Sequence, residues 1–229
     1  MKNLFVLLLA AFSALSPIFA QAPQFKSGDN YTVFGLGIGI PIGQFGATKN
    51  LDTDGFAQSG IAINLDDSYF LTENFAILLS GYITFNSHNT SALSSAFSSA
   101  GLPNVNVSTR NNFFGLCATL GPMLVLPIGN QFNFKLRSGA GISYWETPEY
   151  EVSVQGVTLR ITRASSWVFA FLLGAGVGYK ISDGWELQLL GDFQSARPRF
   201  RFRDPSGGIS ESNLTTSLIA VSLGVAFEF

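Results

Sequence analysis

Four charged residues occur in two segments that are otherwise apolar, where an unpaired charge is costly to bury. Lys135 and Arg137 lie in the first segment, and Glu186 and Asp192 lie in the second. Two carboxylates can act together as a general acid and a general base. In an extended chain, however, Glu186 and Asp192 are about 20 Å apart, because each residue advances a strand by about 3.3 Å. This spacing argues against a catalytic pair, and the sequence predicts no catalytic residues.

Histidine and cysteine, which serve in nucleophilic catalysis and in metal binding, are scarce. The sequence has one of each, His88 and Cys117. His88 lies beside Ser87 and Ser91 in a predicted loop with no acidic residue near it, so a catalytic triad would need an acid from another loop. One histidine and one cysteine on different elements give little support for a metal site. We therefore predict neither a metal nor a cofactor.

A run of alternating arginines carries the strongest local charge. Its members are Arg197, Arg199, Arg201 and Arg203. Phe200 and Phe202 lie between the last three, and a turn sequence with proline and two glycines follows. This pattern predicts a hairpin whose first strand has its arginines on one face. Guanidinium groups bind phosphate through paired hydrogen bonds, so the run is a candidate phosphate contact. The alternative is a solvated ladder that blocks edge pairing.

Eight alternating segments must position these groups. They span residues 31–40, 57–65, 74–85, 110–126, 132–143, 166–179, 185–195 and 215–229. Apolar residues alternate with small or polar ones, as in strands with two different faces. The connections alternate between long and short, which is typical of barrels that cross a membrane up and down. The sequence predicts an all-β fold, an eight-stranded antiparallel up-and-down transmembrane β-barrel, with ten strands as the alternative.

The composition agrees with a membrane barrel. The mean hydropathy is +0.30 and only 12% of residues are charged. After residue 20, no run of apolar residues is long enough for a membrane-spanning helix, which needs about 20. Two classes of protein are then possible: a membrane barrel, or a water-soluble β-protein with a large core. The formal net charge of −2 gives no support for nucleic-acid binding.

The two ends of the chain favour the barrel over the soluble alternative. Residues 1–20 have a basic start, an apolar core and a small-residue cleavage site, so we predict a signal peptide there and a barrel domain over residues 21–229. At the other end, Val225, Phe227 and Phe229 share the apolar face of the last strand. A final amphipathic strand with a terminal aromatic residue is common in bacterial outer-membrane barrels.

The alternation also predicts which residues face the interior. Lys135, Arg137, Glu186 and Asp192 share the inward positions, as does Cys117. An eight-stranded barrel is just wide enough for side chains to fill it, and buried charges must be paired. The sequence therefore predicts a network of ion pairs across the lumen. The alternative is a narrow gated pore lined by the same four groups.

Several local features complete the predicted barrel. Pro122 falls inside a strand, which implies a bulge or a shorter strand. Residues 91–100 predict a short helix or a flexible loop, and residues 151–161 predict a hairpin around Gln155 and Gly156. Aromatic belts are expected at both membrane interfaces. The belt members are Phe70, Phe75, Phe132, Tyr179, Trp185 and Phe229 on the periplasmic side, and Phe85, Phe114, Tyr144, Trp145, Trp167 and Phe193 on the outer side.

Three motifs, at residues 69–75, 176–185 and 225–229, resemble the small outer-membrane β-barrel family that includes the OmpA membrane domain, OmpX-type proteins and opacity proteins. The resemblance covers essentially all of the chain after residue 20. It implies a bacterial outer-membrane location, with lipid, lipopolysaccharide and the barrel-insertion machinery as partners. In the family, terminal residues such as Val225, Phe227 and Phe229 are recognised by that machinery. The even strand number implies that both termini are periplasmic.

These motifs are specific for architecture and say little about activity. We expect a non-enzymatic barrel that serves envelope integrity, adhesion or contact through four external loops, with the arginine run near lipopolysaccharide phosphates. The alternative is a narrow porin-like channel or a carrier of a small ligand. A third hypothesis is an enzyme at the rim that uses His88. No appended peptidoglycan-binding domain is expected, and the external ligand is unknown.

Overall fold

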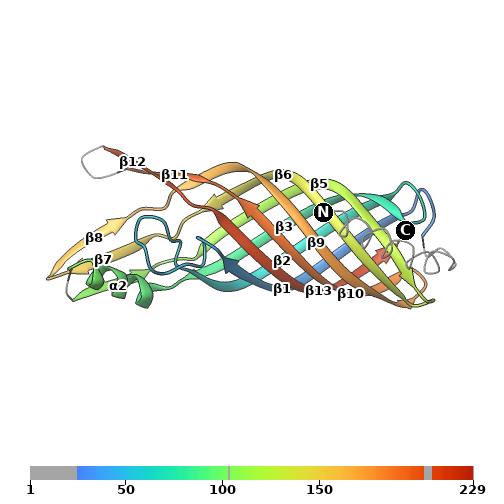
Figure 1. Cartoon of the computed structure of the whole chain (residues 1–229), viewed down its shortest axis with the longest axis horizontal. Helices are drawn as coiled ribbons and strands as arrows, with labels where there is room; N and C mark the ends of the chain where they lie inside the picture. The colour runs from blue at the N-terminus through green and yellow to red at the C-terminus, as the bar shows by residue number, and fades with distance from the viewer. Residues whose placement is uncertain (1–24, 103, 204–207, 229) are drawn as a thin grey trace, which may run out of the picture.

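The computed structural model describes residues 25–102, 104–203 and 208–228, in which eight antiparallel strands close a barrel (Figure 1). The barrel strands are β1 (Asn30–Ile42), β2 (Ala57–Phe70), β3 (Phe75–His88), β5 (Phe113–Ile128), β6 (Phe132–Glu146), β9 (Ser165–Ser182), β10 (Trp185–Ala196) and β13 (Thr216–Glu228). Each strand pairs with its neighbours along the chain, and β1 closes the barrel against β13. The predicted fold is confirmed. The predicted signal peptide, residues 1–20, lies outside the described residues.

The outer surface of the barrel is apolar and its interior is partly polar. On β10, Leu187 and Leu189 are 48% and 52% exposed, whereas Gln188 between them is 2% exposed. The same alternation runs along the other barrel strands, because successive side chains point to opposite faces. An apolar outside on a closed barrel is favoured where hydrocarbon is the surrounding solvent. The predicted orientation of the faces is confirmed.

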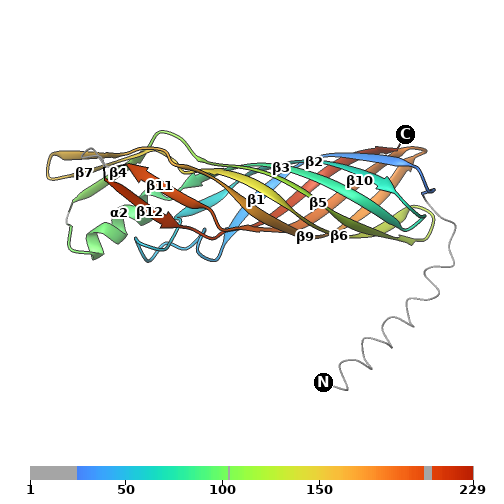
Figure 2. The ribbon, with the colours of Figure 1, turned by 90° about the horizontal axis from the view of Figure 1, so that it is seen from above.

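The two ends of the barrel differ in their connections. At one end, the short-turn end, residues 71–74, 129–131 and 183–184 link neighbouring strands. The other end, the long-loop end, carries the other helix and strands of the described residues (Figures 1 and 2). These are α2 (Thr90–Ser99), β4 (Val105–Thr109), β7 (Tyr150–Val154), β8 (Val157–Ile161), β11 (Arg199–Arg203) and β12 (Ile209–Asn213). The long and short connections alternate as predicted.

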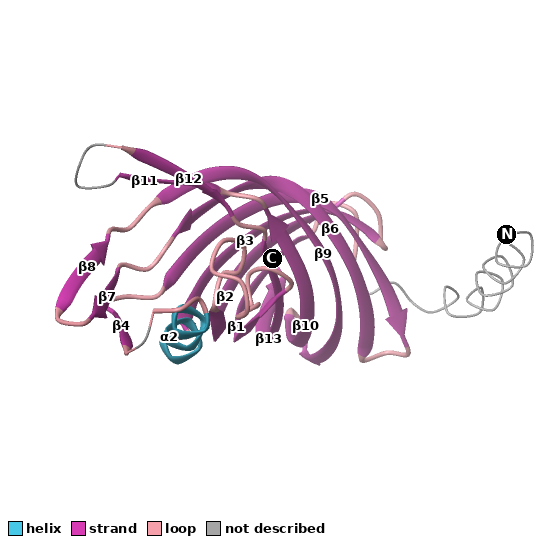
Figure 3. Ribbon diagram, turned by 60° about the vertical axis from the view of Figure 1, so that its left-hand side comes forward, coloured by secondary structure: helices cyan, strands magenta, loops and turns pink. Residues whose placement is uncertain are grey.

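The elements at the long-loop end form two small sheets beside the mouth (Figure 3). β4, β7 and β8 make a three-stranded sheet, and β11 pairs with β12. Asn89 caps α2 by accepting a hydrogen bond from the backbone of Ala92, and Leu93 buries the helix against the three-stranded sheet. The helix in the second loop is therefore present, and the two predicted hairpins are confirmed. No helix in the described part of the chain is both long and apolar enough to cross a bilayer.

Two predicted strand boundaries are wrong. β2 continues to Phe70, so Asp66 and Ser68 belong to the strand and face the interior. Of the adjacent acids at 66 and 67, one faces inward and the other outward, as alternation requires. The predicted strand 110–126 begins at Phe113, because the preceding residues 105–109 form β4 and pair with β7 instead.

Pro122 interrupts one ladder within β5. The strand pairs with β6 at Leu120 and Ala140, and again at Met123 and Arg137, in the same register on both sides of the interruption. Pairing with β3 continues through this point. Proline has no N–H to donate to a neighbouring strand. β5 therefore accommodates Pro122 through a local loss of pairing, and the structure has neither the bulge nor the shorter strand.

Aromatic residues form exposed belts near both ends of the barrel. The exposed or partly exposed members are Phe75, Phe132, Tyr179 and Trp185 at the short-turn end, and Phe85, Phe114, Tyr144, Trp167 and Phe193 at the long-loop end. Phe70 and Trp145 were predicted in these belts, yet they are buried inside at 0% and 4% exposure. Phe70 shares the inner face of Asp66, and Trp145 shares that of Arg137. Phe229 lies outside the described residues.

Candidate functional site

The barrel interior holds a buried cluster of ion pairs centred on Arg137 of β6. Its guanidinium donates from Nε to Asp192 Oδ1 at 2.6 Å and from Nη1 to Asp66 Oδ2 at 2.5 Å. Nη2 donates to the other Asp192 oxygen and to the hydroxyl of Tyr82. All four side chains are at most 5% exposed. A guanidinium suits this site because its planar donors match carboxylates in pairs.

A second cluster surrounds Lys135, two residues nearer the short-turn end on the same face of β6. Lys135 Nζ lies 2.6 Å from Glu186 Oε1 and also donates to the hydroxyl of Tyr31. Tyr31 in turn donates to Glu186 Oε1 at 2.6 Å, and Asn133 donates to Glu186 Oε2 at 2.6 Å. Gln188 donates to the Tyr31 hydroxyl. We call the two clusters together the lumen network.

The structure thus places all four predicted lumen charges inside and joins them in two pairs. Sequence reasoning missed Asp66 and Tyr31, and it gave no partner to Tyr82. Asp66 makes the network unbalanced, because two cations meet three carboxylates among the described residues. The signal for Asp66 was present: the inward alternation of β2 continues beyond the point where we ended the strand.

Glycines on β9 make room for both clusters. Gly174 is the register partner of Arg137 on one side and of Asp192 on the other. A Cβ atom at Gly174 would overlap the Asp192 carboxylate, and one at Gly178 would overlap the Glu186 carboxylate. The ion pairs therefore lie directly against the wall of β9. This explains why small residues occupy the inner face of a strand whose outer face is bulky.

Apolar layers lie on both sides of the lumen network. Toward the long-loop end, the first long loop inserts Phe45, whose ring centroid lies 5.1 Å from that of Phe113 and 5.3 Å from that of Trp145. Toward the short-turn end, Phe25 stacks on Phe70 at 4.2 Å. All five of these rings are at most 4% exposed. The interior is thus packed in alternating polar and apolar layers.

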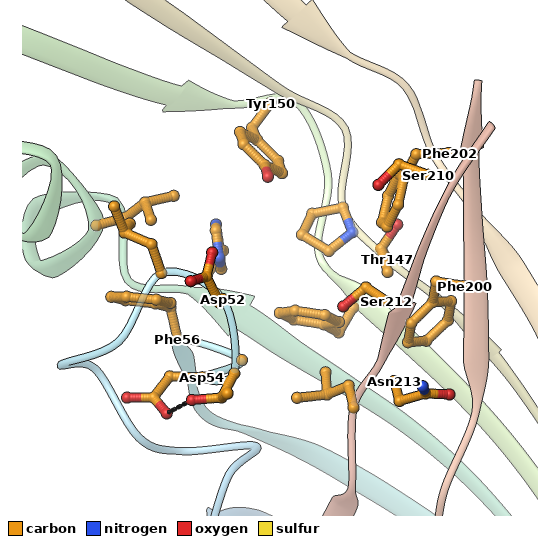
Figure 4. A pocket seen from close by; sticks show the side chains of 18 of the residues that line it. Asp52, Asp54, Phe56, Thr147, Tyr150, Phe200, Phe202, Ser210, Ser212 and Asn213 are labelled. Carbon is orange, nitrogen blue, oxygen red and sulfur yellow. Dashed lines mark hydrogen bonds between the residues drawn. The ribbon is translucent and has the colours of Figure 1, made fainter. Parts of the chain in front are cut away.

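A cavity of about 550 Å³ lies at the mouth, above Phe113 (Figure 4). We call it the mouth cavity. The first long loop contributes Asp52 and Phe56 to one side, and the β11–β12 hairpin contributes Phe200 and Phe202 to the other. A volume of this size is typical of sites that hold a small molecule. None of the described residues that line it is a lysine or an arginine.

His88 sits in the aromatic wall of the mouth cavity. Its ring centroid lies 6.2 Å from that of Phe56 and 5.5 Å from those of Phe113 and Tyr150. Burial lowers the pKa of His88 from 6.5 to about 4, so the ring is neutral at pH 7. Its Nδ1 atom is buried and has no hydrogen-bond partner among the described residues.

The arrangement around His88 lacks the contacts of a nucleophile and its base. Ser87 Oγ lies 3.2 Å from Gln58 Oε1, and Ser91 Oγ donates to Asn89 Oδ1 at 2.9 Å. Neither serine bonds to His88 in the part of the chain that the structure describes. Within the same residues, no group of three or more His, Cys, Asp or Glu side chains could hold a metal ion.

The arginine run forms the first strand of the β11–β12 hairpin. Arg197, Arg199 and Arg201 are exposed, whereas Phe200 is 2% exposed and packs toward the mouth. Arg201 donates to Glu211 on β12 at 2.7 Å. Arg197 and Arg199 form no ion pair with a described residue. The side chain of Arg203 lies outside the described part of the structure.

The terminal strand carries two of the three predicted assembly residues on its outer face. Val225 and Phe227 are 41% and 39% exposed. Phe227 lies against Trp185 of β10, with ring centroids 5.9 Å apart. Phe229 lies outside the described residues. β13 also forms the closing seam with β1, so this strand completes the barrel.

Comparisons with known proteins agree with this architecture. The chain is similar over most of its length to OprG of Pseudomonas aeruginosa, with 14% identity, 91% of this chain and 99% of the other covered, and a TM-score of 0.52. Ail, the attachment invasion locus protein of Yersinia pestis, gives 15% identity, coverage of 89% and 99%, and a TM-score of 0.48. A major outer membrane protein from Thermus thermophilus gives 14% identity, coverage of 88% of this chain and 99% of the other, and a TM-score of 0.45.

These identities are too low to transfer an activity, and they concern the fold alone. The sequence matches no curated protein. A family model described as the outer membrane protein beta-barrel domain, by contrast, matches residues 5–227. That match spans nearly the whole chain and includes every strand of the closed barrel. The chain therefore belongs to the outer membrane protein beta-barrel domain family.

Proposed function

We propose that this bacterial outer-membrane barrel is a non-enzymatic, closed barrel that acts through its long loops. The lumen network is the observation that carries the proposal. Arg137 and Lys135 each bridge residues of other strands, so the polar side chains are tied to one another across the lumen. Buried ion pairs of this kind are costly to open one partner at a time. A continuous water path would have to break them.

The apolar layers support the same conclusion. An ion that entered at the mouth would meet the rings of Phe45, Phe113 and Trp145 before it reached Arg137. Apart from the indole N–H of Trp145, such a layer offers no hydrogen bonds to replace those of a hydrated ion. We therefore expect solutes to stop at the mouth, where the helix, the three-stranded sheet and the β11–β12 hairpin form the accessible surface.

Conductance measurements test the closed lumen. Purified protein in a planar lipid bilayer should give no steady single-channel current. Steady openings that Glu186→Gln alters, and that Asp183→Asn in a turn leaves unchanged, would instead establish a channel lined by the network. Asp183 is a suitable control because its side chain is fully exposed at the short-turn end.

The orientation is part of the proposal: both termini and the short turns face the periplasm, and the long loops face outward. This arrangement is typical of outer-membrane barrels. A cysteine at Ser99 in α2 should react with a membrane-impermeant maleimide on intact cells, and a cysteine at Asp183 should not. Cys117 is 6% exposed and contributes little background. The reverse labelling pattern would overturn the orientation.

We also propose that the arginine run contacts lipopolysaccharide phosphates. Arg197 and Arg199 are exposed and have no ion-pair partner among the described residues, and the run continues from β10 beyond the apolar belt. Paired guanidinium donors suit phosphate oxygens. Val225, Phe227 and Phe229 are proposed to be recognised by the barrel-insertion machinery, because two of them present apolar side chains on the outer face of the closing strand.

A further inference from the structure

The mouth cavity combines a wall of aromatic rings with an unbalanced set of charges. His88 joins Phe56, Phe113 and Tyr150 into one continuous wall, with ring centroids 5.5 to 6.2 Å apart. Aromatic faces carry partial negative charge and attract ammonium groups. A wall of this kind, in a cavity of about 550 Å³, suits a small molecule that has an apolar body.

The ionisable groups at the cavity are mostly acidic. Asp52, Asp54 and Glu211 line it, and no lysine or arginine of the described part of the chain does. His88, which also lines the cavity, is neutral at pH 7 because its burial lowers its pKa to about 4. Glu211 is already paired with Arg201, so the carboxylates of Asp52 and Asp54 would repel an anionic ligand and attract a cationic one.

The three carboxylates differ in whether the protein already satisfies them. Asp54 accepts hydrogen bonds from the backbone of Lys49 and Asn50 at 2.7 and 2.8 Å, and Glu211 is paired with Arg201. The Asp52 carboxylate has neither a hydrogen bond nor an ion pair with any described residue. Figure 4 shows it extending from the first long loop into the space between Phe56 and Tyr150.

Two arginines of the long loops are already paired with acids. Arg160 pairs with Glu149, and Arg110 pairs with Glu151 at 2.7 Å. Asp52 is thus the carboxylate of the cavity that a ligand can use without breaking an existing contact. A cation at this position would also lie beside the aromatic wall, so both attractions act on the same group.

We propose that the mouth cavity binds a small organic cation, with its ammonium group at Asp52 and its apolar or aromatic body against the wall around His88. This inference goes beyond the proposed closed barrel and does not depend on it. Binding at the mouth needs no passage through the lumen, and it can be measured on purified protein whatever the orientation of the barrel.

Three probes of nearly equal size separate the contributions of charge and shape. Calorimetric titration of the full-length protein in nanodiscs would use phenethylammonium, 2-phenylethanol and phenylacetate. We expect phenethylammonium to bind about tenfold tighter than the alcohol, and phenylacetate to bind weakest. Added salt should weaken binding of the cation and leave that of the alcohol unchanged. Equal affinities for the cation and the anion would overturn the proposal.

Two variants locate the ammonium group. Asp52→Asn should reduce the affinity for phenethylammonium about fivefold to tenfold, to near that of the alcohol. Asp183→Asn, which removes an equal charge at the opposite end of the barrel, should leave it unchanged. Because Asp52 is exposed and unpaired among the described residues, its replacement should not disturb folding. Unchanged cation binding in Asp52→Asn would overturn the assignment.

Discussion

Arg137 of β6 and Asp192 of β10 form an ion pair across β9, over the single residue Gly174 that is in register with both. The two charged residues lie 55 positions apart in sequence and are not on adjacent strands. Their contact is possible because Gly174 has no side chain to fill the space between them. The absence of a side chain at Gly174 is therefore as necessary for this ion pair as the two charges are.

Replacing Arg137 should cost far more stability than replacing Asp66. Arg137→Met leaves two buried carboxylates without their cation, which is expected to cost about 3–5 kcal/mol. Asp66→Asn leaves one carboxylate for one cation, and its amide oxygen can still accept from Arg137 while its NH2 donates to the Ser80 hydroxyl, so its cost should stay below about 2 kcal/mol. Urea unfolding in detergent measures both, with exposed Glu73→Gln as the surface control. Equal losses of stability for the two variants would contradict the argument that the network has more carboxylates than cations.

A methyl group at Gly174 should disrupt the ion pair that lies against it. The new Cβ would overlap the Asp192 carboxylate and press on Arg137, so Gly174→Ala should destabilise the barrel by about 1–3 kcal/mol. Gly191→Ala is the matched control. Gly191 faces outward, and a Cβ atom there would have its nearest neighbour 3.9 Å away. The unfolding midpoints of the two variants should differ, and coincident midpoints would show that the wall tolerates the methyl group.

Acidification should loosen the aromatic wall through His88. Its folded pKa of about 4 lies below the unfolded value of 6.5, so between these values the unfolded state binds more protons. The stability that neutral His88 supports is present above pH 6.5 and decreases as the pH falls toward 4, by at most about 1.4 kcal/mol per pH unit. Hydrogen exchange of α2 and the end of β3 should therefore accelerate at pH 4.5.

The variant His88→Phe keeps an aromatic ring and removes the titrating group. It should abolish the change in exchange between pH 7.5 and pH 4.5 in these elements, once intrinsic exchange rates are corrected for pH. Tyr150, which packs against His88, does not titrate in this range, because burial raises its pKa further above 10. A pH response that persists in His88→Phe would assign the effect to another group.

Arg199 should contribute more to lipopolysaccharide retention than Arg201. Both are exposed on β11, but Glu211 already neutralises Arg201 at 2.7 Å. Arg199→Ala should therefore weaken binding of purified lipopolysaccharide by several-fold, and Arg201→Ala by less, because an exposed pair contributes only about 0–1 kcal/mol. The double variant Arg201→Ala with Glu211→Ala should match the wild type. Retention that no variant alters would end the phosphate proposal.

Phe227 should matter for assembly more than its exposed area alone explains. Phe227→Ala should lower the fraction of folded, heat-modifiable barrel in cells, and Phe229→Ala should do the same. Leu223→Ala is the control, because Leu223 lies on the same outer face of β13 and is 70% exposed, against 39% for Phe227. If apolar contact with lipid were the only effect, Leu223→Ala would be at least as harmful as Phe227→Ala.

The sequence alone was enough to predict the strands, their faces and the closed architecture. These follow from the alternation of apolar and polar residues with a period of two. This alternation depends only on local geometry, so it can be recognised within a single segment such as β10. It also placed Lys135, Arg137, Glu186 and Asp192 inside. It failed at Asp66, which lay just beyond the predicted end of its strand, and at Phe70 and Trp145, where belt membership was assigned against their alternation.

Which of the inward residues meet depends on the closed three-dimensional arrangement of the strands. Arg137 could have paired with several acids, and the register of β6, β9 and β10 selects Asp192, while closure of the barrel brings Asp66 to the same guanidinium. The mouth cavity likewise arises from loops that are distant in sequence. No local sequence pattern therefore predicts that the carboxylate of Asp52 and the ring of Tyr150 line the same cavity. Contacts across a closed barrel depend on strand stagger, which no single segment of the chain encodes.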